Sequence, residues 1–213
     1  TEACVEDINT ADVGDWVRLE DVKEKTISSR FVYQCKLRAN GAVEAFCRWT
    51  PRGYEEEPGE HYDPEKIFAG TPQLWALRLI LVTSLVQKRA TCHFDFKRAF
   101  SHAPIDMTVY VTMPKGYVIY DDEGYELCLR LRKSSEGLKQ SAANWTKVLS
   151  EFLKKDGFKQ CVKEPCLWRY RLNDGKFVLV VVYVDDMYIS CPDDAWLKKF
   201  FERTQKVAPC KNL

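Results

Sequence analysis

FVLVVVYVDDMYIS, at residues 177–190, is the stretch from which the fold can be built outward. Its first seven residues are apolar and mostly β-branched, which is typical of a strand buried on both faces. Two adjacent carboxylates, Asp185 and Asp186, follow one residue later, and a second short apolar run comes after them. The simplest interpretation is a β-hairpin whose tip carries the two carboxylates.

Two explanations of this acidic tip remain open from the residues alone. Neighbouring carboxylates at the ends of buried strands repel each other, so the arrangement is costly unless a cation lies between them. The alternative is an ordinary solvated Asp-Asp turn, in which the side chains serve only the turn.

The composition is that of a soluble globular protein. The chain has 213 residues, 46% of them hydrophobic and 30% charged, enough for one large domain or two small lobes. A formal net charge of +1 gives no global indication of a nucleic-acid partner. Residues 127–176, however, hold 12 Lys and Arg against 5 Asp and Glu. This basic segment suits a phosphate backbone, although a solvated helix face has the same composition.

The nine cysteines are scattered along the chain rather than spaced for a disulfide framework or a metal. Cys35, Cys47, Cys92 and Cys128 lie in apolar or alternating runs, where a free thiol acts as a small core residue. We therefore expect no zinc site and a reducing intracellular location, in the cytoplasm, the nucleus or an organelle. No apolar run approaches the ~20 residues that a membrane span needs, so no membrane association is expected.

Strand and helix patterns alternate along the chain, which predicts an α+β fold. Period-2 alternation around Asn40-Gly41 predicts a hairpin. Apolar residues at helical spacing predict two amphipathic helices, and the remaining patterns predict a mostly buried helix and a strand that ends in a carboxylate. These elements are expected at residues 31–49 (hairpin), 145–155 and 194–206 (amphipathic helices), 74–86 (buried helix) and 92–96 (strand).

Four blocks of sequence now resemble, in order and spacing, those of copia-type retrotransposon reverse transcriptases. YVDD at 183–186 is similar to the family's hairpin signature, and DFKRAF at 95–100 is similar to Asp-Val-Lys-Thr-Ala-Phe. VYVTMPKGY at 109–117 and GLKQ at 137–140, with Trp145 further on, match the two blocks between them. Together the blocks span nearly the whole chain.

The resemblance implies the fingers and palm of a right-hand polymerase, with an antiparallel palm sheet packed on helices. Residues 1–15 are then a loose lead-in. Fingers are expected at 16–90 and 118–145, and palm at 91–117 and 146–213. The family's thumb and RNase H regions are expected to be absent.

The activity implied is RNA-directed DNA polymerisation by two-metal phosphoryl transfer with two Mg²⁺ or Mn²⁺ ions. By resemblance, Asp95 and Asp185 bridge both ions, Asp186 assists, and the Phe96 carbonyl adds a ligand. Hard carboxylate oxygens are the ligands that Mg²⁺ prefers.

Further roles carry over from the family to matching positions. Arg48 and Arg52 are expected to hold the incoming triphosphate, with Gln140 near the nucleotide. Phe100 stands where the family crowds the sugar 2′-position, although a plain core phenylalanine explains it equally well.

Lys139, Tyr183 and Val184 are expected beside the template and primer. This chain also departs from the family pattern: Phe46 replaces a lysine near the triphosphate, and Glu136 adds an opposing charge. These departures weaken the expected grip on nucleotide.

The expected partners are an RNA or DNA template-primer and deoxynucleoside triphosphates. The alternative is a domesticated, catalytically idle copy acting as a structural or RNA-binding subunit of a larger assembly. A stand-alone metal nuclease has little support, because no His or further carboxylate cluster is evident.

Overall fold

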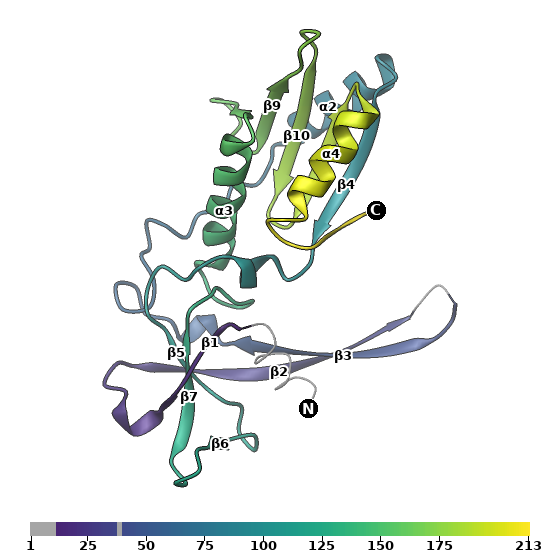
Figure 1. Cartoon of the computed structure of the whole chain (residues 1–213). Coiled ribbons are helices and arrows are strands. Elements are labelled where there is room, and N and C mark those ends of the chain that lie inside the picture. The colour runs from purple at the N-terminus through teal and green to yellow at the C-terminus, as the bar shows by residue number, and fades with distance from the viewer. Residues whose placement is uncertain (1–11, 38–39) are drawn as a thin grey trace. The chain divides into compact units, whose positions relative to one another are not determined.

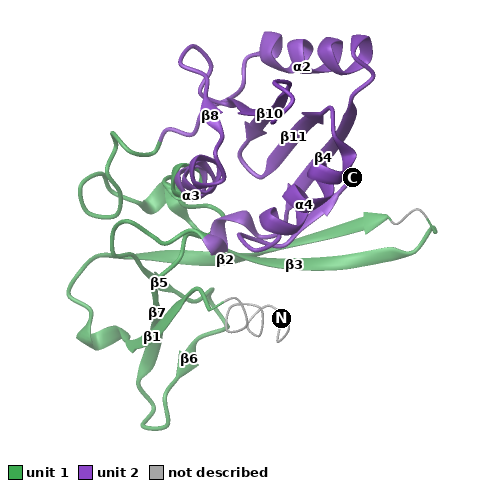
Figure 2. Cartoon of the chain, turned by 45° about the horizontal axis from the view of Figure 1, so that its top comes forward, with its two compact units in different colours: residues 1–67, 103–144 green, residues 68–102, 145–213 purple. Residues whose placement is uncertain are grey.

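The computed structural model describes residues 12–37 and 40–213, and the chain folds into two compact units. The first unit comprises residues 1–67 and 103–144, and the second comprises residues 68–102 and 145–213 (Figure 2). Each unit is therefore assembled from two separate stretches of chain.

A six-stranded sheet forms the first unit. Its strand order is β1-β7-β5-β2-β3, with β6 paired to β7. β2 and β5 run parallel, and the other paired strands run antiparallel. The strands are β1 (Gly14–Arg18), β2 (Thr26–Leu37), β3 (Val43–Pro51), β5 (Tyr110–Thr112), β6 (Ile119–Tyr120) and β7 (Glu126–Leu131), with 3₁₀ turns η1 (Leu19–Asp21) and η2 (Gly53–Glu55).

The predicted hairpin is confirmed as β2 and β3, which pair from Leu37 opposite Val43 to Ser29 opposite Pro51. At its turn the Ala42 amide donates to Asn40 Oδ1 at 3.1 Å, which is the local bond that suits asparagine to turns.

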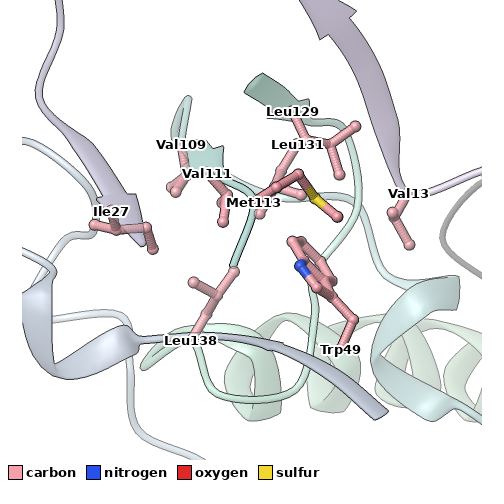
Figure 3. Close-up of a cluster of buried hydrophobic side chains, with 9 residues drawn as sticks. All are labelled: Val13, Ile27, Trp49, Val109, Val111, Met113, Leu129, Leu131 and Leu138. Atoms are coloured by element: carbon pink, nitrogen blue, oxygen red, sulfur yellow. The ribbon is translucent and has the colours of Figure 1, made fainter. Parts of the chain in front are cut away.

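The core of the first unit gathers apolar side chains from its strands and adjoining loops (Figure 3). Figure 3 shows Met113 pointing toward the Trp49 ring. Trp49 Nε1 donates to Ser29 Oγ at 2.9 Å, and that hydroxyl donates to the Thr112 carbonyl at 2.6 Å, so the buried polar groups are satisfied. The buried members are Val13, Ile27, Trp49, Val109, Val111, Met113, Leu129, Leu131 and Leu138.

Gly137 lets two backbone segments of this unit approach closely. A Cβ on Gly137 would lie 2.4 Å from the Pro51 carbonyl oxygen, and Gly137 also has a φ of +101°. We expect Gly137→Ala to destabilise the unit by about 3 kcal/mol, from overpacking and left-handed strain together. Gly116→Ala is the matched control, because Gly116 has a φ of +86° but nothing within 4 Å of its Cβ position. Urea denaturation checks this; equal losses in both variants would show that the approach is not tight.

A second six-stranded sheet, with the order β12-β4-β11-β10-β9-β8, forms the second unit. All of its paired strands run antiparallel. The elements are α2 (Leu74–Val86), β4 (Ala90–Phe96), the 3₁₀ turn η3 (Ala99–His102), α3 (Ser141–Lys155, from Trp145 onward in this unit), β8 (Lys159–Gln160), β9 (Leu167–Arg171), β10 (Phe177–Tyr183), β11 (Asp186–Cys191), α4 (Asp194–Thr204) and β12 (Cys210–Asn212).

Helices cover both faces of this sheet, with α2 on one side and α3 and α4 on the other (Figures 1 and 2). Side chains alternate between the two faces of a strand, so each strand of this sheet can contribute side chains to the helix layers on both faces. Val181 packs with Ile80 of α2. On the opposite face, Phe94 packs on Phe200 of α4 with ring centroids 6.3 Å apart.

The helix predicted at 74–86 is confirmed, but the expectation that it is mostly buried is wrong. Only Ala76, Ile80 and Ser84 are buried, on the stripe that faces the sheet. Its outer face exposes large apolar side chains, such as Leu85 with 78% of its surface accessible. Periodicity could not reveal this, because a helix that is apolar all round reads as buried.

The two compact units divide the chain at other points than the boundaries expected for fingers and palm. α2 packs on β10 and β11 in the second unit rather than the first. Residues 103–117 join the first unit, because β5 is hydrogen-bonded to β2 and β7. The expected lead-in also ends early, since β1 begins at Gly14; residues 1–11 lie outside the described part of the chain.

The cysteines also differ in part from expectation. Cys92 and Cys128 are buried free thiols, and burial raises their pKa values to about 12 and about 11. Cys35 is free but exposed, and Cys47 is disulfide-bonded, so neither is a small core thiol. Among the described residues, no helix is long and apolar enough to cross a bilayer.

Candidate active site

The hairpin predicted around the two carboxylates is present, and its turn is held from two sides. Tyr183 of β10 lies opposite Asp186 of β11, so Val184 and Asp185 form the turn. Trp145 Nε1 donates to the Val184 carbonyl at 2.8 Å, and the Phe96 amide donates to the Asp185 carbonyl at 3.0 Å. Both turn residues are therefore fixed through their backbone.

Val184 has a φ of +52°, which is rare for a β-branched residue. A positive φ at the first central residue of a two-residue hairpin matches the right-handed twist of the strands. Conformations of this kind cost of order 1–3 kcal/mol and persist where the surroundings determine them. The hydrogen bond from Trp145 supplies such a constraint.

The third predicted carboxylate, Asp95, reaches the same place through the pairing of β4 with β11. Asp95 lies directly opposite Asp186 in this antiparallel register. Opposed residues point to the same face, with Cβ atoms about 4.5–5.5 Å apart. Two aspartates far apart in the sequence thus become neighbours at the end of one sheet.

Electrostatics link the three groups. The protein crowded around the carboxyl of Asp185 raises its pKa above the ordinary value, and the negative charges of Asp186 and Asp95 raise it further. A cation placed among these groups would offset the repulsion.

His93 is a fourth member of this group that the sequence did not reveal. Its Nε2 lies 2.6 Å from Asp186 Oδ1. His93 precedes Asp95 by two residues on β4, so the two side chains share a face. That alternation was the available signal, but a lone histidine in a strand has no motif to mark it.

The donor type suits a divalent cation, although the side chains do not converge as a ready site. Carboxylate oxygens are the ligands that Mg²⁺ and Mn²⁺ prefer. Within residues 12–37 and 40–213, however, no three His, Cys, Asp or Glu side chains are grouped so that they could hold a metal ion. One oxygen of Asp186 is instead engaged by His93.

The apolar candidates near the turn have different surroundings. The Phe96 side chain is buried against Trp145 with ring centroids 5.1 Å apart, so only its backbone can serve the site. Phe100 is half-buried in η3, whereas Tyr183 is 48% exposed beside the turn.

The predicted triphosphate-binding arginines lie in the first unit, and both face carboxylates there. Arg48 pairs with Glu136 at 2.6 Å. Arg52 donates to Ser28 Oγ at 3.3 Å and lies 3.8 Å from a Glu55 oxygen. Glu136, recognised in the sequence as an opposing charge, is thus the direct partner of Arg48.

Lys139 and Gln140 make internal contacts in the first unit. Lys139 Nζ donates to the Glu56 carbonyl at 2.9 Å and lies over the Tyr62 ring. Gln140 is fully buried, and its Nε2 donates to the His61 carbonyl at 3.1 Å.

Gln140 Oε1 and Glu56 Oε1 are buried, and neither has a geometrically sound hydrogen-bond partner in the described part of the chain. Burial raises the pKa of Glu56 above its ordinary value, while hydrogen bonds from the Lys139 amide and the Gln140 side chain oppose that rise. The contacts of Gln140 are therefore those of a core residue.

Comparison with known proteins finds a family model and relatives of one kind, which are polyproteins of transposons. A family model described as "Reverse transcriptase (RNA-dependent DNA polymerase)" matches residues 15–213. The retrovirus-related Pol polyprotein from transposon TNT 1-94 of Nicotiana tabacum is 26% identical over 84% of this chain and 13% of its own length.

Two further relatives extend the comparison. The Pol polyprotein from transposon RE2 of Arabidopsis thaliana is 28% identical over 81% of this chain and 12% of its own length. The transposon Ty1-H Gag-Pol polyprotein of Saccharomyces cerevisiae is 28% identical over 89% of this chain and 10% of its own length. The chain thus spans about a tenth to an eighth of these relatives.

Proposed function

Because this chain belongs to the reverse transcriptase (RNA-dependent DNA polymerase) family, of the type found in copia-like transposons, we propose that it carries out template-directed DNA synthesis. The observation that carries the proposal is the pairing of Asp95 with Asp186 beside the Asp185 turn. Phosphoryl transfer needs hard oxygen ligands in one place, and this strand register makes two aspartates neighbours.

We assign the second unit to the palm and the first unit to the fingers of a right-hand polymerase. The support is an antiparallel sheet that carries the carboxylates at one end, with α3 and α4 packed on one face. On this assignment, α2 belongs to the palm and β5 to the fingers, in place of the boundaries expected from the sequence.

Asp95 and Asp185 would hold the divalent cations, with Asp186 and the Phe96 carbonyl as further oxygen donors. Two bound Mg²⁺ or Mn²⁺ ions supply activation of the primer 3′-hydroxyl and charge neutralisation at the triphosphate. The protein fixes the turn backbone, through Trp145 and the Phe96 amide, so that the backbone carrying Asp185 does not have to be ordered when substrate arrives.

Nucleotide would be held by Arg48 and Arg52. Phe100 would crowd the sugar 2′-position, and the fully buried Gln140 would support the first unit from its core. Since Arg48 already pairs with Glu136, a triphosphate must displace an intramolecular partner to reach it. Template and primer would contact Lys139, Tyr183 and Val184.

The test is primer extension on a defined RNA template with the four deoxynucleoside triphosphates and Mg²⁺ or Mn²⁺. We expect extension that copies the template and stops when EDTA removes the metal. Extension that ignored the template sequence, or no extension with either metal over a range of primer lengths, would contradict the proposal.

The second candidate function is an idle polymerase fold that binds RNA as part of a larger assembly. The ion pairs of Arg48 and Arg52 and the internal contacts of Lys139 favour it, because they occupy groups that a polymerase needs free. RNA binding in filter assays without extension would support this candidate over the first.

A further inference from the structure

His93 lies on the strand that supplies Asp95 and on the same face of the sheet. Thr91, His93 and Asp95 alternate along β4, and the register places Asp95 opposite Asp186 and His93 opposite Tyr188. His93 therefore reaches diagonally across to the strand that follows the turn, where its Nε2 meets Asp186 Oδ1 at 2.6 Å.

The direction of this hydrogen bond follows from the chemistry of the two groups. An ionised carboxylate only accepts, so the imidazole donates through Nε2. The bond engages Oδ1 of Asp186, whereas Oδ2 has no hydrogen-bond partner among residues 12–37 and 40–213. The His93 and Asp186 side chains are 38% and 44% exposed, so burial does not fix the carboxylate, and the donor must do so.

Repulsion makes such a donor useful. The negative charges of Asp186 and Asp95 both repel a negative charge on the Asp185 carboxylate. A carboxylate with free rotamers would turn away from the other two toward water. One hydrogen bond from a strand residue limits that freedom and keeps the group beside Asp95.

We propose that His93 is a positioning residue, which orients Asp186 so that its second oxygen faces a divalent cation held with Asp95 and Asp185. This inference rests on the cation site of the proposed function. Donors that orient ligating groups in this way typically change metal affinity by 10–100-fold when removed. An exposed His–Asp pair without such a role would contribute only about 0–1 kcal/mol to stability and nothing to cation affinity.

The experiment measures Mn²⁺ binding to the full chain by titration calorimetry and by the electron paramagnetic resonance of free Mn²⁺, without nucleic acid or nucleotide. We expect His93→Ala to weaken binding at least about tenfold. His93→Gln keeps an N–H donor of similar reach and should stay within about threefold of the unmutated chain. Thr91→Ala, two residues earlier on the same face, is the matched control and should bind as the unmutated chain does.

A double-mutant cycle separates orientation from a general loss of structure. In an Asp186→Asn background, His93→Ala should cause little further loss, because the carboxylate that it orients has gone. Circular dichroism of each variant, and the His93→Gln rescue, keep the test valid if the alanine variant folds poorly.

The other possible outcomes separate the role of His93 from the existence of the cation site. If Asp185→Asn weakens Mn²⁺ binding but His93→Ala does not, the role of His93 fails and the cation site stands. If His93→Ala binds Mn²⁺ more tightly, His93 competes with the cation and the proposal is wrong. If the unmutated chain binds no Mn²⁺, both the cation site and the role of His93 fail.

Discussion

Asp185→Asn should lower primer extension by about a thousandfold or more, because several kcal/mol of charge stabilisation depend on the groups that hold the cations. The substitution keeps the size and shape of the side chain and removes its charge. Asp174→Asn is the matched control, since Asp174 lies in the turn at the other end of β10 and pairs with Lys176 at 2.9 Å. Single-nucleotide extension rates check the result. A loss of comparable size in Asp174→Asn would show that the effect is not specific to Asp185.

The same variant should be as stable as the unmutated chain, or more so, when no metal is present. Asp185 has its pKa raised by the protein around it and by the charges of Asp186 and Asp95, so its ionised form is less stable in the fold than in the unfolded chain. Between the ordinary Asp pKa, about 3.9, and the raised value, the unmutated chain therefore loses stability as the pH rises. The advantage of Asp185→Asn should be present at neutral pH and disappear at low pH.

Added Mn²⁺ should reverse this order. A cation that binds only the folded state stabilises it by RT ln(1 + [L]/Kd), about 1–3 kcal/mol at tens to hundreds of Kd. We expect that gain in the unmutated chain and in Asp174→Asn, and little of it in Asp185→Asn. Melting curves with and without Mn²⁺ measure it; an equal gain in all three proteins would place the bound ions elsewhere.

Local patterns predicted many elements of this fold. The apolar run before Asp185 predicted a hairpin, and the long apolar run at 74–86 predicted α2 at the bounds that the structure has. That Asp95 lies near Asp185 and Asp186 was expected only from resemblance to a family, since no local pattern connects residues so far apart; the register opposite Asp186 was not predicted. The short strands β1, β6, β8 and β12 were missed, because strands of two to five residues have too few positions to show alternation.

The contacts that tune the site could not be read from the sequence, because they depend on register and side-chain reach. His93 meets Asp186 only because β4 pairs with β11 in one register, and a shift of one residue would place it on the other face. The pairing of Arg48 with Glu136 joins residues that the sequence predicted in separate roles. Such pairs can be identified only from a three-dimensional structure, which gives the positions of both the strand and the loop.

Trp145 connects the core to the turn formed by Val184 and Asp185, and its removal should be the most destabilising of these changes. The side chain is fully buried, packs edge-on against Phe96, and donates its Nε1 hydrogen to the Val184 carbonyl. Trp145→Ala should cost about 3–5 kcal/mol in urea denaturation, from lost burial and the cavity left behind. Because this loss could unfold the second unit, a smaller change is needed to separate packing from the hydrogen bond.

Trp145→Phe retains most of the packing but loses the donor to Val184. The variant should lose about 1 kcal/mol, because the part-buried carbonyl of Val184 is left without this partner. The turn also holds Val184 at a φ of +52°, so without the bond it should relax and carry Asp185 away from its place beside Asp95. Mn²⁺ affinity and primer extension should then fall by more than the stability loss explains. Trp196→Phe is the matched control: Trp196 packs on Phe200 at 5.2 Å in the same unit and makes no contact with the turn in the described structure. If Trp145→Phe behaves as Trp196→Phe does in stability, Mn²⁺ binding and extension, the indole bond does not hold the turn.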